Sequence, residues 1–155
     1  MANESGLNIV IERVFDAPRD LVWKVWTEPE HVAAWWGPHG MKTRVDELDF
    51  RVGGAWRYVM VSPDGGEYPQ RGEFQEIAPP ELIVTSAIFE YGGSMPAQHA
   101  VLTYRFEDLG AQTKMTMTHA STDGMEYNEE MVQGITYGWN LNWDALVEYL
   151  PSITG

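Results

Sequence analysis

The chain has 155 residues, enough for one domain with a proper hydrophobic core, and 44% of the residues are apolar. A formal net charge of -13 repels phosphate backbones and anionic lipid headgroups, so we expect no nucleic-acid partner and no membrane insertion. The chain has no cysteine, which excludes disulfides, thiolate nucleophiles and cysteine-based metal sites.

The first elements that the sequence predicts are a strand and two short helices. Apolar residues that change face once along the chain predict the strand: Ile9, Ile11, Val14 and Phe15. Pro18 suits the first turn of a helix, and apolar residues then recur at helical spacing: Leu21, Val22, Val25 and Trp26. Pro29 begins the second helix, and Gly37-Pro38 ends it.

Residues 43–119 predict a meander of about six antiparallel strands. Turn-forming residues separate the strands, at 53–54, 63–66, 79–81, 92–93 and 108–110. Three sets of side chains alternate onto one face of their strand: Trp56, Tyr58 and Met60; Leu102, Tyr104 and Phe106; Met115, Met117 and His119. Each set is interpreted either as core or as the lining of a pocket, because the sequence leaves open which strand faces point inward.

Residues 125–150 predict one long helix with an unusually wide apolar arc. Gly134 and Gly138 lie one turn apart inside the arc, where each costs about 0.5–1 kcal/mol relative to alanine. Close approach of the helix to the sheet would compensate for this cost, and so would room for a ligand. Asn142 lies near the centre of the arc, where its amide must meet a structural partner or a ligand's polar group.

The order of these elements predicts an α+β fold, and a series of short motifs narrows it. The motifs are residues 35–38 (WWGP), 49–57 (DFRVGGAWR), 63–65 (PDG), 72–82 (GEFQEIAPPEL) and 138–139 (GW). Together they resemble the Hsp90-ATPase-activator-like (AHSA1) family of the SRPBCC, or START/Bet v 1-like, superfamily, from about Ile9 to Leu150. The resemblance implies a single domain over residues 1–155 with the helix-grip fold. In that fold a curved antiparallel sheet wraps around a long C-terminal helix, and two short helices follow the first strand.

The resemblance and the surplus of aromatic and methionine side chains favour a binding module for a small apolar or aromatic molecule. We expect its cavity between the sheet and the C-terminal helix. The predicted ligand-binding residues are Trp36, Trp56, Tyr58, Met60, Met115, Met117, His119, Gly138, Trp139 and Asn142.

Two alternatives come from the same resemblance. One is interaction with an Hsp90-type chaperone, although the sequence has no counterpart of the eukaryotic activator's separate N-terminal module. The other is a cyclase-like or hydrolase-like enzyme for a small aromatic or polyketide-like substrate, in which His119, Tyr58 or Asn142 would steer the reaction.

No motif in the sequence carries catalytic or metal chemistry. The spacing of the four histidines, His31, His39, His99 and His119, gives no sign of convergence, and no HExxH, Gly-x-Ser-x-Gly or P-loop pattern is present. We therefore expect no catalytic residue, metal or cofactor. Without a signal peptide or a run of roughly 20 apolar residues, a cytoplasmic location is the default expectation.

Overall fold

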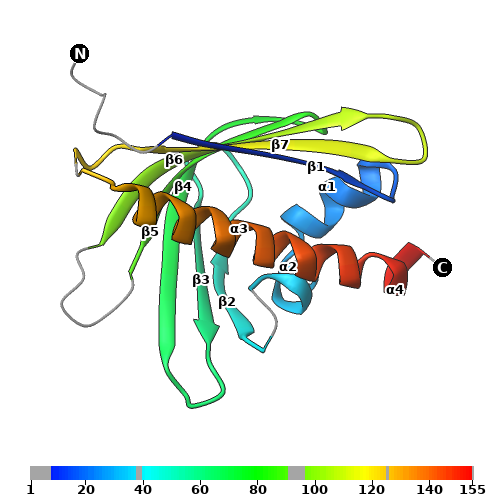
Figure 1. The fold of residues 1–155 in the computed structure, drawn as a ribbon. Coiled ribbons are helices and arrows are strands. Elements are labelled where there is room, and N and C mark those ends of the chain that lie inside the picture. The colour runs from blue at the N-terminus through cyan, green and yellow to red at the C-terminus, as the bar shows by residue number, and fades with distance from the viewer. Residues whose placement is uncertain (1–7, 38–39, 91–96, 125, 155) are drawn as a thin grey trace.

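The computed structural model describes residues 8–37, 40–90, 97–124 and 126–154 (Figure 1). The strands are β1 (Asn8–Phe15), β2 (Lys42–Leu48), β3 (Ala55–Val61), β4 (Glu67–Ala78), β5 (Leu82–Phe89), β6 (Gln98–Asp108) and β7 (Thr113–Ser121). The helices are α1 (Arg19–Thr27), α2 (Pro29–Trp35), α3 (Glu129–Tyr149) and α4 (Pro151–Thr154). This element order confirms the predicted α+β fold, with two short helices after the first strand and a long C-terminal helix.

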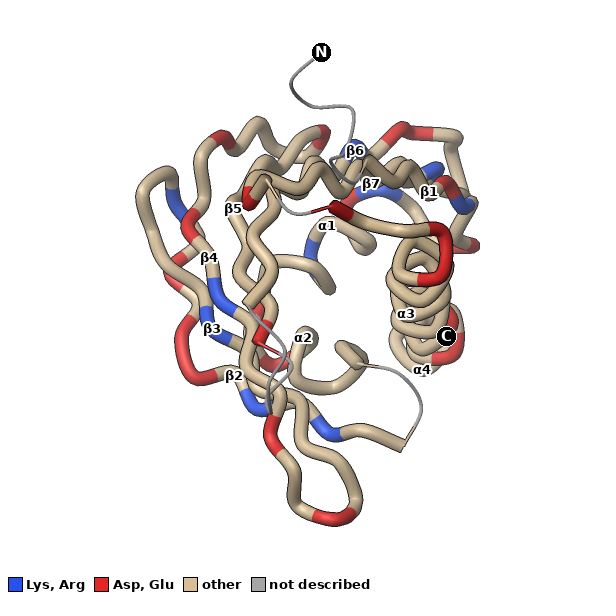
Figure 2. Tube along the Cα trace, turned by 60° about the vertical axis from the view of Figure 1, so that its left-hand side comes forward, with Lys and Arg blue, Asp and Glu red and all other residues tan. Residues whose placement is uncertain are grey.

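All seven strands belong to one antiparallel sheet in the order β1-β7-β6-β5-β4-β3-β2. Strands β1 and β2 follow one another in the sequence but form opposite edges of the sheet, so α1 and α2 connect the two edges. Seen along α3, the sheet curves around the helix (Figure 2). The helix therefore lies on the concave face, as the helix-grip expectation requires.

Strand β1 differs from its prediction, because it does not change face. Ile9, Ile11 and Phe15 are all buried on the inner side, and Val14 is 47% exposed. Arg13 takes the inward position between them, and its guanidinium donates to Asp144 Oδ1 at 2.7 Å and to Asn140 Oδ1 at 2.9 Å. Because α3 supplies these partners, the strand accommodates an inward-facing arginine and stays regular.

Prolines set the start of the two short helices. Pro18 is the N-cap of α1, and Pro29 occupies the first turn of α2. The buried faces match the predicted spacing: Val22, Val25 and Trp26 in α1, and Val32 and Trp35 in α2. Gly37 follows with a φ of +101°, a conformation that strains any residue with a Cβ, so glycine redirects the chain here. Pro38 and His39 lie outside the described residues.

Helix α3 begins later than predicted. Residues 126–128 are described and are not helical, whereas Met125 lies outside the described residues, as does the predicted turn at 92–93. Asn128 is the N-cap, and its Oδ1 accepts a hydrogen bond from the Met131 N–H at 2.8 Å. Asparagine is among the best N-cap residues because its side chain satisfies an otherwise unpaired backbone donor, which fixes the start of the helix here.

The C-terminal half of α3 contributes Trp143 to the aromatic core, where it meets β1 and α1. Trp143 is fully buried there, with ring centroids 5.4 Å from Phe15 and 6.3 Å from Trp26. Leu146 and Leu150 continue the same buried face. Within the described part of the chain, no helix is long and apolar enough to cross a membrane.

Candidate functional site

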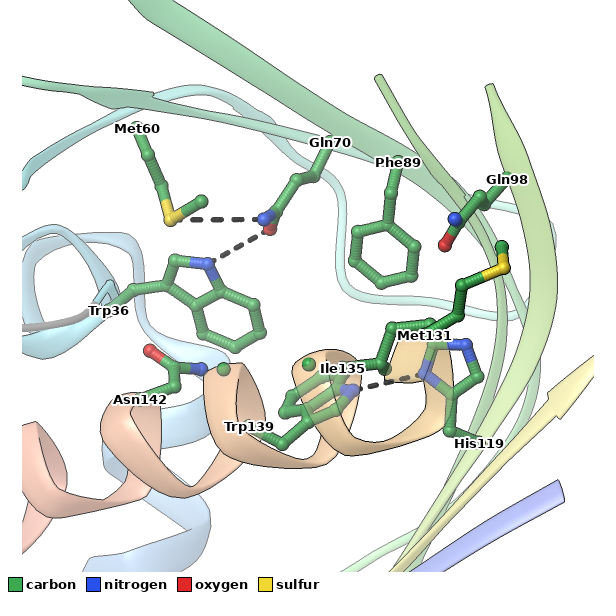
Figure 3. A pocket seen from close by; sticks show the side chains of 12 residues that line it. Trp36, Met60, Gln70, Phe89, Gln98, His119, Met131, Ile135, Trp139 and Asn142 are labelled. Carbon is green, nitrogen blue, oxygen red and sulfur yellow. Dashed lines mark hydrogen bonds between the residues drawn. The ribbon is translucent and has the colours of Figure 1, made fainter. Parts of the chain in front are cut away.

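A pocket of about 320 Å³ lies between α3 and the concave face of the sheet (Figure 3). Five consecutive strands and the chain after α2 contribute to its wall. The lining residues are Trp36, Met60, Gln70, Phe89, Gln98, His119, Met131, Gly134, Ile135, Gly138, Trp139 and Asn142.

The two helix glycines provide the room for this pocket. A Cβ placed on Gly134 or Gly138 would have no heavy atom within 4 Å outside its own helix surroundings. Gly72 of β4 is different, because a Cβ there would lie 1.9 Å from the Ser86 carbonyl oxygen. The expectation that Gly134 and Gly138 permit close approach to the sheet is therefore wrong, and these positions border open space.

One end of the pocket is closed by side chains that satisfy one another. Trp36 Nε1 donates to Gln70 Oε1 at 3.0 Å, and Gln70 Nε2 lies 3.8 Å from Met60 Sδ. The Trp36 ring also packs edge-on against Tyr58 and Trp139, with centroids 5.2 and 6.1 Å away. The amide and the indole therefore hold each other in place as a preformed wall.

Asn142 joins α3 to the segment after α2. Its Oδ1 accepts a hydrogen bond from the backbone N–H of Gly37 at 2.5 Å, and the side chain is buried. This contact provides the structural partner that a polar residue in the apolar arc requires. Asn142 also lines the pocket, and its Nδ2 has no partner among the described residues. The two interpretations of Asn142 are thus compatible, since its two polar atoms have separate surroundings.

His119 and Trp139 form the opposite end. Trp139 Nε1 donates to His119 Nδ1 at 3.0 Å, and the Phe89 ring stacks on the imidazole with a centroid distance of 5.6 Å. Burial lowers the pKa of His119 to about 4, although nearby Asp123 partly offsets this effect. The imidazole is therefore uncharged at neutral pH.

Gln98 lies at the same end of the pocket, next to Phe89 across the β5–β6 pair. Only 4% of the residue is exposed, and its Oε1 has no hydrogen-bond partner among the described residues. The side chain extends from β6 toward the pocket (Figure 3). A buried polar atom without a partner is uncommon and calls for an explanation.

Comparison with known protein families identifies the family of this chain. A family model described as Activator of Hsp90 ATPase homolog 1-like protein matches residues 16–151. The chain belongs to this AHSA1-like family. The match confirms the resemblance carried by the sequence motifs. No curated protein matches the chain significantly.

Solved structures share the architecture of this AHSA1-like domain. A Chromobacterium violaceum protein has a TM-score of 0.77 at 24% identity, covering 91% of this chain and 94% of that one. An Arthrobacter aurescens protein has a TM-score of 0.76 at 26% identity, covering 96% of this chain and 88% of that one. The AHSA1 protein from Silicibacter pomeroyi has a TM-score of 0.75 at 20% identity, covering 94% of this chain and 98% of that one. These similarities concern the fold.

Six of the ten predicted ligand-binding residues of the AHSA1-like domain line the pocket: Trp36, Met60, His119, Gly138, Trp139 and Asn142. The other four lie in the core beside it. Met115 and Met117 are fully buried, and Trp56 Nε1 donates to Thr85 Oγ1 at 2.7 Å. Tyr58 packs between Trp36 and Trp56, and burial raises the pKa of its hydroxyl above the ordinary value.

The prediction missed lining residues whose positions follow from regular alternation. Gln98 shares a face of β6 with Leu102, Tyr104 and Phe106, the set that alternation predicts from the sequence. Gln70 and Phe89 likewise share the inward faces of their strands with buried residues. On α3, the residues missing from the predicted set are Met131, Gly134 and Ile135, and Met131 lies about one turn before the other two. Extending the predicted face of β6 to the start of the strand would have found Gln98, whereas the sequence analysis assigned no inward face to β4 or β5.

The lining offers little for acid–base or metal chemistry. Among the lining residues that the structure describes, none is Asp, Glu, Lys or Arg, and an imidazole with a pKa of about 4 is a weak base at neutral pH. His31 lies elsewhere, with Nδ1 2.6 Å from the Tyr149 hydroxyl, and His99 is exposed. Across the described ranges, no three His, Asp or Glu side chains gather in a way that could hold a metal ion.

Proposed function

We propose that this domain binds a small, uncharged, largely apolar or aromatic molecule between the sheet and α3. The observation that carries the proposal is the open space of about 320 Å³ beside Gly134 and Gly138, walled by aromatic and methionine side chains. This volume lies within the range of sites for small molecules, and such sites are usually apolar with a few oriented polar groups. The glycines weaken the helix, and room for a ligand accounts for them.

The uncharged lining restricts the class of ligand. A carboxylate or ammonium would lose its hydration on entry and find no side chain of opposite charge among the described residues of the wall. Neutral amides, indoles and one neutral imidazole provide the polar contacts instead. The ligand is therefore a neutral molecule with a hydrophobic body and one or two polar groups.

Native mass spectrometry of the protein purified from its own source is the direct test. A retained molecule would appear as a mass added to the chain, and extraction of the denatured protein would identify it. We expect a neutral, mainly hydrocarbon compound. Recovery of a charged, strongly hydrated molecule from the pocket would contradict the proposal.

A filled-pocket variant supplies the second test. Gly138→Leu places an apolar side chain where the structure has open space, so equilibrium dialysis should show a loss of naphthalene binding. Gln133→Leu is the matched control, because it adds the same side chain at an exposed position one residue before Gly134. Equal naphthalene affinity in wild type and Gly138→Leu would place binding outside this pocket.

A chaperone partner is the alternative that the family's description suggests. It requires an external binding face and no cavity, so it makes different predictions. Pull-down with the Hsp90 of the same organism, together with an ATPase assay, tests it. Association that survives Gly138→Leu would favour this alternative, and the absence of association at tens of micromolar would remove it.

A further inference from the structure

The polar atoms at the two ends of the pocket are used differently. Gln70 at one end has its amide oxygen occupied by the indole N–H of Trp36. Gln98 at the other end is 4% exposed, and its amide oxygen accepts no hydrogen bond from any described residue. Both glutamines line the same space. Gln98 therefore presents an unused acceptor to whatever occupies the pocket.

His119 presents an unused donor at the same end. Its Nδ1 lies 3.0 Å from Trp139 Nε1, and an indole nitrogen can only donate. Nδ1 must therefore be the acceptor, which puts the hydrogen of the neutral imidazole on Nε2. No described residue is a hydrogen-bond partner of Nε2. Trp139 thus fixes both the orientation and the tautomer of this ring.

Phe89 lies next to both His119 and Gln98. Its ring stacks on the His119 imidazole, and its backbone is paired with Gln98 in the β5–β6 register. The three side chains line the end of the pocket nearest Met131 (Figure 3). An aromatic surface, an N–H donor and a C=O acceptor therefore belong to the lining of the same end of the pocket.

We infer that the Gln98–His119 end of the pocket recognises a hydroxyl group on an otherwise apolar or aromatic ligand, an inference that rests on the proposed binding function. A hydroxyl accepts from His119 Nε2–H and donates to Gln98 Oε1. A ketone or an ether accepts only, so it leaves Gln98 Oε1 unpaired. A hydrocarbon satisfies neither group. The preferred ligand class is accordingly an alcohol or a phenol.

Three two-ring molecules separate these cases: 2-naphthol, 2-methoxynaphthalene and naphthalene. The first donates and accepts, the second only accepts, and the third does neither. Equilibrium dialysis at pH 7 measures their affinities for the wild-type protein. Because one additional hydrogen bond is made, we expect 2-naphthol to bind about 3- to 10-fold more tightly than 2-methoxynaphthalene.

The variant Gln98→Met tests whether the Gln98 side chain causes the preference for 2-naphthol. Methionine has nearly the shape of glutamine but no carbonyl acceptor, so the preference for 2-naphthol over 2-methoxynaphthalene should fall to about 2-fold or less. Gln133→Met is the matched control, because it makes the same change at an exposed position of α3 and should leave the preference intact. His119→Asn retains an acceptor for Trp139 Nε1 and lacks the Nε2 donor, so it should weaken binding of both oxygen-containing molecules relative to naphthalene.

The outcomes separate this inference from the function on which it rests. Equal wild-type affinity for 2-naphthol and 2-methoxynaphthalene would overturn hydroxyl recognition and leave the binding proposal standing. A preference that persists in folded Gln98→Met would also overturn it. If none of the three molecules binds the wild type, the proposed function fails and hydroxyl recognition fails with it.

Discussion

The two halves of α3 have different surroundings although they belong to one continuous helix. In the C-terminal half, Trp143 and Leu146 are fully buried against the aromatic core. In the N-terminal half, Gly134 and Gly138 face open space, and Ile135 is only half-buried. A wide apolar arc on a helix therefore does not imply uniform packing. One half of this arc is core, and the other half is a wall of the pocket.

The boundary between the halves is held by polar contacts. Trp139 donates to His119, and Asn142 accepts from Gly37. Both residues line the pocket and are themselves buried. These hydrogen bonds fix the helix against the sheet and the segment after α2, so the pocket keeps its shape without side chains filling it.

The largest expected difference comes from two aliphatic truncations, one in each half. Leu146→Ala should lower the free energy of unfolding by about 2–5 kcal/mol, because Leu146 is fully buried and leaves a cavity. Ile135→Ala removes a half-buried side chain beside existing space and should cost about 1 kcal/mol. Urea unfolding of both variants measures the contrast. Equal losses would show that the two halves are packed alike.

Acidification should lower the free energy of unfolding, because protonation of His119 is less favourable in the folded protein. Burial holds its pKa at about 4, below the usual 6.5, so the unfolded chain binds the proton more readily. The stability that depends on a neutral His119 is therefore fully present above pH 6.5 and is lost as the pH falls from 6.5 toward 4. Between pH 7 and pH 5 the loss attributable to His119 should be roughly 2 kcal/mol.

Comparison with His119→Asn isolates this effect from the titration of carboxylates. The variant lacks the imidazole but keeps an acceptor for Trp139 Nε1, so its unfolding free energy should depend less on pH. Urea unfolding of both proteins at pH 7 and pH 5 gives the difference. Identical pH dependence in the two proteins would contradict the assignment to His119.

Removing the second boundary contact tests Asn142. Asn142→Leu strands the buried Gly37 N–H and should lower the free energy of unfolding by about 1–3 kcal/mol. Thermal melts of the variant and the wild type measure this loss. Unchanged or increased stability would show that the amide serves the pocket more than the helix contact.

The smallest expected effect on stability is at the glycines. Because a Cβ meets nothing at Gly138, Gly138→Ala should raise the free energy of unfolding by about 0.5–1 kcal/mol through improved helix propensity. Gly72→Ala is the contrasting control, since its Cβ would clash with the Ser86 carbonyl oxygen, and it should be destabilising. Destabilisation by Gly138→Ala would indicate that α3 lies closer to the sheet than described.

The sequence by itself determined the elements and the fold. Helical spacing with well-placed prolines predicted α1 and α2, and turn residues separated the strands of the meander. These features depend on neighbours within a few residues, so local patterns suffice. The motif series identified the family for the same reason, since it is a property of the chain and not of its packing.

Only the tertiary structure decided where side chains meet across distant segments. Arg13 could face inward because α3 supplies Asp144 and Asn140, and alternation within β1 carries no information about that helix. The apolar arc of α3 likewise did not reveal which half is filled, since core and pocket wall require the same apolar side chains. Gln98 became distinctive only when the fold buried its amide oxygen without a partner among the described residues, because that property depends on every segment around it.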